Sequence, residues 1–125
     1  MYSKVVFEHF LAPKNIGKII DPDGEAAVGD PGCGDNLELF IRVEDDIIVD
    51  LKYLVYGCAS AIATSSVTST LAIGKTIEEA LKIEDMDVIN VLEELPEAKH
   101  HCSNLGVTAL RMAIQDYRDK KQINS

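Results

Sequence analysis

Apolar and polar residues alternate along two neighbouring stretches of the chain, and this pattern predicts a β-hairpin. Every second residue is apolar from residue 37 to 43 and again from 49 to 55. A period of two is typical of strands with one buried face. Asp45 and Asp46 lie between the two stretches and supply turn chemistry. A shorter strand is expected at residues 25–30.

After Gly57 the apolar spacing becomes helical. Residues 59–73 are small and uncharged, which predicts a helix packed on several sides and ended by Gly74. Thr76 and Asp85 are typical N-cap residues for two short helices farther along the chain. Helices are also expected over residues 3–11, 77–82 and 103–121, and from the Asp85 cap to about Leu92.

Strands therefore come first and helices follow, an order that predicts an α+β fold. We expect a small antiparallel sheet of about three strands packed against several helices on one face. The 125 residues, 46% of them hydrophobic, suit one domain over residues 1–125 with its own apolar core.

The net charge of the chain argues against two classes of binding partner. The chain has 21 acidic and 12 basic residues, a formal net charge of −9, which argues against nucleic-acid binding and against docking on anionic membranes. The uncharged stretch 53–74 is rich in Ser and Thr, so we interpret it as a strand and a buried helix rather than a membrane span. No export signal is evident and the cysteines number three, an odd count that favours a reducing, cytoplasmic location over a disulfide framework.

All three cysteines fall where predicted elements begin or end. Cys33 precedes the hairpin, whereas Cys58 and Cys102 precede predicted helices. A helix N-terminus stabilises a thiolate, which is the form that binds metal or attacks sulfur. This arrangement favours metal or sulfur chemistry over three separate packing roles.

Three thiolates are one ligand short of a tetrahedral site. Asp35 and His101 are the nearest additional ligands in sequence. A zinc site and a [2Fe–2S] cluster with one ligand other than cysteine both fit this donor set. Asp is a weak and labile ligand for a soft site, which suits a cluster that is released.

At these residues the chain closely resembles the IscU/NifU-type scaffold family, nearly end to end. The resemblance is carried by several segments: Pro13-x-Asn15-x-Gly17, Cys33-Gly34-Asp35, Tyr56-Gly57-Cys58 with Ser60-Ala61-Ile62-Ala63, and Leu95-Pro96-x-x-Lys99-x-His101-Cys102-Ser103. It implies an IscU/SufE-like fold and a scaffold, not an enzyme, on which a [2Fe–2S] cluster is built from iron and persulfide sulfur.

The resemblance also implies roles for individual residues. Cys33, Cys58 and Cys102 would hold the transient cluster, with Cys102 as the persulfide acceptor. Asp35 would promote cluster release and His101 would be an alternative ligand. Zinc would occupy the same site in the cluster-free form.

The partners implied are an IscS/NifS-type cysteine desulfurase, recipient apo iron–sulfur proteins and a chaperone pair. Leu95, Pro96 and Lys99 lie in the segment that family members present to the chaperones, although Glu97 and Ala98 stand where the family often has Pro-Val. Whether the chain forms a homodimer or a trimer stays open.

Two alternatives rest on the same thiolates. One is a zinc-binding protein that relays persulfide sulfur. That branch of the family carries an insertion between the second and third cysteines, and none is evident between Cys58 and Cys102. The other is a structural zinc domain, which would unfold on chelation.

Overall fold

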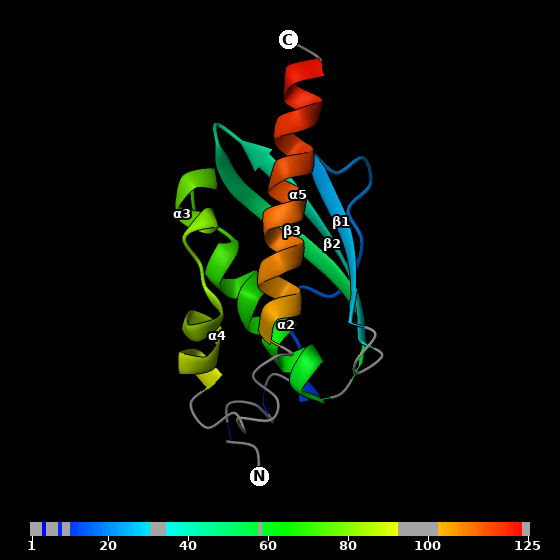
Figure 1. Cartoon of the computed structure of the whole chain (residues 1–125), viewed down its shortest axis with the longest axis vertical. Coiled ribbons are helices and arrows are strands. Elements are labelled where there is room, and N and C mark those ends of the chain that lie inside the picture. The colour runs from blue at the N-terminus through cyan, green and yellow to red at the C-terminus, as the bar shows by residue number, and fades with distance from the viewer. Residues whose placement is uncertain are drawn as a thin grey trace.

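The computed structural model of the protein describes residues 4, 8, 11–30, 35–57, 59–92 and 103–123. It confirms the α+β prediction: three strands precede the helices that pack on them (Figure 1). The described elements are β1 (Gly24–Asp30), β2 (Asp35–Glu44), β3 (Ile47–Tyr56), α2 (Ala59–Ala72), α3 (Ile77–Leu81), α4 (Asp85–Leu92) and α5 (Ser103–Ile123).

The strands form one antiparallel sheet in the order β1-β2-β3. The predicted hairpin is β2 and β3, and its turn is made by Asp45 and Asp46, whose φ angles are 51° and 65°. Left-handed values at both turn residues suit the twist of a two-residue hairpin loop. The pairing of β2 with β3 shifts by one residue between Arg42 and Val43, a bulge close to the turn.

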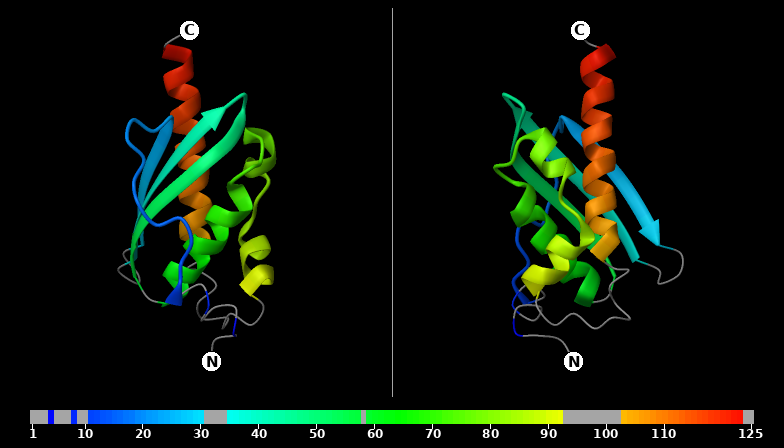
Figure 2. Two further views of the ribbon diagram at one scale, coloured as in Figure 1. Left: turned by 180° about the vertical axis from the view of Figure 1, so that it is seen from behind. Right: turned by 60° about the vertical axis from the view of Figure 1, so that its left-hand side comes forward.

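The core lies between the sheet and the helices. The inward positions of the hairpin, among them Leu39, Ile41 and Leu51, are buried. Both views of Figure 2 place α2 and α5 on the same face of the sheet. The segment before β1 runs along the free edge of β3, where Ile16 forms a parallel bridge with Tyr53.

Helix α2 is buried on nearly every side, as its uncharged sequence predicts. Its hydroxyl groups avoid the cost of burial by donating back to the helix. Ser65 Oγ donates to the carbonyl of Ala61 at 2.7 Å, and Thr68 Oγ1 donates to that of Thr64 at 2.8 Å. A polar composition is therefore compatible with a dry environment.

Two of the predicted helix boundaries are confirmed and one is wrong. Gly74 follows α2 with φ +91°, and Thr76 caps α3 in a reciprocal capping box with Glu79. Asp85, in contrast, is the first residue of α4 rather than its cap. The amide of Glu84 donates to the Asp87 carboxylate at 2.8 Å, so a carboxylate inside the helix stabilises its start.

A helix was predicted over residues 3–11. Lys4, Glu8 and Leu11 are helical, in agreement with it, and the remaining residues of that range lie outside the described ones. Within the described residues, no helix is both long enough and apolar enough to cross a bilayer.

Candidate functional site

The element ends that flank the three cysteines lie at one end of the fold. We call this region, defined by Asp30, Asp35, Tyr56, Ala59 and Ser103, the cysteine-flanking end. It is the lower part of Figure 1, where β1 and β3 end and where β2, α2 and α5 begin. Figure 2 shows the same grouping from two further directions.

The sheet register explains why the strand ends meet. Asp30 pairs with Asp35, and Asn36 pairs with Tyr56. The chain therefore leaves β1, enters β2 and leaves β3 at neighbouring positions at one end of the sheet. Partners in antiparallel strands have Cα atoms only about 5 Å apart.

Helix α5 is held against α2 by a close contact near its own start. A Cβ added to Gly106 would lie 2.6 Å from Thr68 Oγ1, so the absence of a side chain allows the two helices to approach. Gly106 is the fourth residue of α5. This contact fixes where α5 begins relative to α2 and the sheet.

Both predicted helix starts are present. α2 begins at Ala59 and α5 begins at Ser103, immediately after Cys58 and Cys102 in the sequence. The amide groups of a helix's first turn lack partners within the helix and carry partial positive charge. These two ends can therefore favour negative charge on the residues that precede them.

Most of the predicted site residues lie outside the described residues. They are Cys33, Cys58, Leu95, Pro96, Lys99, His101 and Cys102. Asp35 is described as the first residue of β2, without its side chain. Within the described ranges, no group of three or more His, Cys, Asp or Glu residues could hold a metal ion.

Sequence reasoning missed a polar seam behind this end. The amide of Lys14 donates to Ser66 Oγ and the side chain of Asn15 donates to Ser69 Oγ, both at 2.9 Å. These bonds tie the segment before β1 to α2, and the amide of Gly17 ties it to the Tyr53 carbonyl of β3 at 2.9 Å. The unusual Ser and Thr content of α2 was the signal that could have indicated it.

Tyr53 lies at the same seam, with none of its surface exposed. Among the described residues, its hydroxyl has no hydrogen-bond partner of good geometry. Burial raises the pKa of Tyr53 to about 12, opposed more weakly by the neighbouring Ser66 hydroxyl. Tyr53 therefore stays neutral and acts as a packing residue with an unsatisfied polar atom.

Comparison with known proteins identifies similar chains. The family model for the NifU-like N-terminal domain matches residues 1–124. The iron–sulfur cluster assembly scaffold protein IscU 1 of Archaeoglobus fulgidus is 55% identical over 117 residues, which is 94% of this chain and 76% of that protein. IscU of Escherichia coli K12 is 42% identical over 125 residues, 97% of each chain.

A solved structure supports the fold. The crystal structure of a NifU-like protein (N-terminal) from Brucella abortus matches with a TM-score of 0.78 at 22% identity, and the match covers 94% of both chains.

Proposed function

The chain belongs to the family of NifU-like N-terminal domains, and on that premise we propose that it is a scaffold on which an iron–sulfur cluster is assembled and then passed to recipient proteins. The observation that carries the proposal is the identity of 42–55%, over nearly the whole chain, to proteins named iron–sulfur cluster assembly scaffolds.

The proposed ligands are Cys33, Cys58 and Cys102. Chain connectivity supports this set, because Cys58 is bonded to the first residue of α2 and Cys102 to the first residue of α5. Cys33 lies in the short segment between Asp30 and Asp35, which are partners in the sheet. All three chain segments thus depart from the cysteine-flanking end.

Cys102 is the proposed sulfur acceptor. Its thiolate would attack the outer sulfur of a persulfide on a cysteine desulfurase. A new S–S bond forms on Cys102, the donor's S–S bond breaks, and the donor cysteine leaves as a thiolate. A thiol reductant then gives up two electrons and becomes a disulfide, which breaks the S–S bond on Cys102 and releases one of the two sulfides of a [2Fe–2S] cluster.

Asp35 and His101 are the proposed exchangeable ligands. A carboxylate oxygen binds a soft iron–sulfur site more weakly than a thiolate. Exchange at such a ligand lets a recipient thiolate enter without breaking a bond to cysteine. We expect Asp35→Ala to lengthen the lifetime of the cluster under anaerobic conditions, whereas Glu44→Ala, at the other end of β2, should leave it unchanged. A shorter lifetime in Asp35→Ala would contradict this role.

Anaerobic reconstitution tests the function itself. Ferrous iron, cysteine and a cysteine desulfurase are added to the chain, the visible spectrum is recorded, and iron, sulfide and zinc are counted per chain. A red-brown chromophore that passes to an apo-ferredoxin is expected, and each of Cys33→Ser, Cys58→Ser and Cys102→Ser should abolish stable assembly. Thr70→Ser, an exposed change on α2, is the control.

Two results would overturn the proposal. Full assembly in all three cysteine variants would remove the assigned ligands. Persulfide on a cysteine with zinc retained and no chromophore would indicate a sulfur-relay protein instead.

A further inference from the structure

Strand β1 has an open edge. The amide of Glu25 does not face β2, because it donates to the Asp116 carboxylate of α5 at 3.0 Å. Alternate residues of a strand direct their amide and carbonyl groups to the same side, so Ala27 and Gly29 direct theirs to that same edge. Both residues are exposed, and neither backbone amide has a hydrogen-bond partner among the described residues.

The face of the sheet opposite α2 and α5 is hollow beside this edge, and Asp116 of α5 reaches the rim of the hollow. Two adjoining cavities of about 510 Å³ and 430 Å³ share Ala27 and Glu38. They form because Ala27 and Gly29 of β1 have small side chains or none, whereas their cross-strand neighbours on β2 and β3 have larger ones. One row is Ala27, Glu38 and Leu54, and the next is Gly29, Asn36 and Tyr56. We call this hollow the β1 groove.

The β1 groove is apolar at one end and acidic at the other. Tyr56, which is 81% exposed, and Leu54 line the end nearest the cysteine-flanking end. The other end is lined by Glu25, Glu38 and Asp116.

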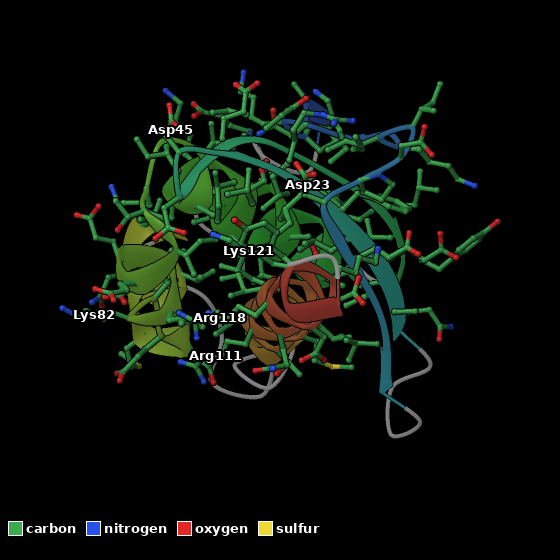
Figure 3. The ribbon with its side chains drawn as sticks, turned by 90° about the horizontal axis from the view of Figure 1, so that it is seen from above. Asp23, Asp45, Lys82, Arg111, Arg118 and Lys121 are labelled. Atoms are coloured by element: carbon green, nitrogen blue, oxygen red, sulfur yellow. The ribbon has the colours of Figure 1, made fainter. Side chains whose placement is uncertain are left out.

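Among the described residues, Glu25 and Glu38 form no ion pair, whereas Asp116 does. Lys120 pairs with Asp116 at 3.1 Å, and Lys18 lines the apolar end. Figure 3, seen along α5, shows that Arg111, Arg118 and Lys121 lie on the side of α5 away from β1. The formal charge of the chain is −9, so pairing of two copies at this edge would bring like charges together.

From these observations we propose that β1 docks an extended, basic segment of a partner protein as a fourth strand. The open amide and carbonyl groups of Ala27 and Gly29 pair with the segment's backbone, which provides affinity without sequence preference. Glu25 and Glu38 lie on the face of the sheet that also carries Ala27 and Leu54, and the side chains of a docked strand alternate between its two faces. The segment's Lys or Arg side chains therefore lie on that same face, where their charged ends meet Glu25 and Glu38 and their aliphatic stems cover the hollow over Ala27. Its alternate side chains are apolar and point to the opposite face. The docked segment would lie next to the cysteine-flanking end, although its binding needs no cluster.

A defined peptide tests the proposal on the intact chain in a chelator. The probe is a fluorescein-labelled octapeptide of alternating Lys or Arg and Val, and binding is measured by fluorescence anisotropy. Its twin with Glu at every basic position should not bind. Two versions, N-methylated at either the basic or the Val residues, test the backbone pairing, because one of them must lose the amides that face β1.

The variants separate charge from backbone pairing. Glu38→Lys is expected to weaken binding at least tenfold. Glu44→Lys changes the net charge equally on the same strand outside the groove and should change binding less than twofold. Ala27→Pro removes one edge amide and should also weaken binding at least tenfold. Should Ala27→Pro fail to fold, the N-methylated peptides test the same amides on the unchanged chain.

Three outcomes would overturn the proposal. Equal binding of the acidic twin would exclude charge recognition, and equal binding of both N-methylated peptides would exclude strand addition. A dimer in sedimentation equilibrium that Ala27→Pro dissociates would make a second copy the occupant of the edge. Because the assay uses the cluster-free chain, each result is independent of the reconstitution experiment.

Discussion

Replacing Gly106 by Ala should destabilise the fold through its contact with α2. The added Cβ would lie 2.6 Å from Thr68 Oγ1 and 3.1 Å from Thr68 Cβ. Thr68 is fully buried and bonded to the Thr64 carbonyl at 2.8 Å, and a β-branched side chain has few alternative rotamers. The clash must therefore move one helix relative to the other.

The magnitude follows from two opposing effects. Alanine gains up to about 1 kcal/mol over glycine inside a helix, whereas overpacking a filled core costs about 1–3 kcal/mol. We expect a net loss of about 1–2 kcal/mol. With a urea m-value near 1.5 kcal/mol/M, this lowers the denaturation midpoint by roughly 1 M.

A double-mutant cycle identifies the cause. Thr68→Ala removes the nearest clashing atom, so Gly106→Ala/Thr68→Ala should be less destabilised than the sum of its single changes by about 1 kcal/mol. The cycle with Thr64→Ala, one turn away on α2, should be nearly additive. A Gly106→Ala chain as stable as the natural one would contradict the predicted clash, because α5 would then have room to spare against α2.

Three further experiments test the buried Tyr53, the hydrogen bond of Asn15 to α2, and the need for metal in folding. Because the pKa of Tyr53 rises from 10.0 to about 12 on folding, the folded state keeps a proton that the unfolded state loses, so stability falls by at most roughly 2–3 kcal/mol as pH rises from 10 to 12. Tyr53→Phe should lack this loss and be at least as stable at pH 7 in urea unfolding; a large loss at pH 7 would mean that the hydroxyl is satisfied. Asn15→Ala removes the bond to Ser69 and strains a φ of 66°, which should cost about 1–2 kcal/mol, whereas Asn15→Gly, measured in the same way, should recover only the strain. Chelation should leave the far-UV circular dichroism unchanged, and unfolding would instead indicate a structural zinc domain.

The spacing of apolar residues was sufficient to predict most helices and strands, because an element that is buried on one face needs apolar residues at regular positions. Alternation in residues 37–55 predicted β2 and β3, and the uncharged run predicted α2. The start of α4 was predicted one residue late as a cap, since Glu84, Asp85 and Asp87 all offer carboxylates or amides near one turn. Which of them caps depends on backbone geometry that composition does not contain.

The features that position the candidate site were harder to predict from the sequence. The prediction that helices begin after Cys58 and Cys102 needed only local signals, and it is confirmed by the starts of α2 and α5. The β1 groove depends on Ala27 standing beside Glu38 and Leu54, a register that no local pattern specifies. The roles of Ser66 and Ser69 depend likewise on contacts more than 50 residues away in sequence.

The composition of the core bears on how the proposed scaffold could release a cluster. Within the described residues, the buried apolar side chains come from β2, β3, the helices and Ile83 between α3 and α4, and they form one cluster. A 125-residue domain with such a core does not need metal binding as folding energy. Ligands carried on segments beyond the element ends could then exchange without repacking the interior. A permanent structural site would gain from the opposite arrangement, with its ligands inside the core.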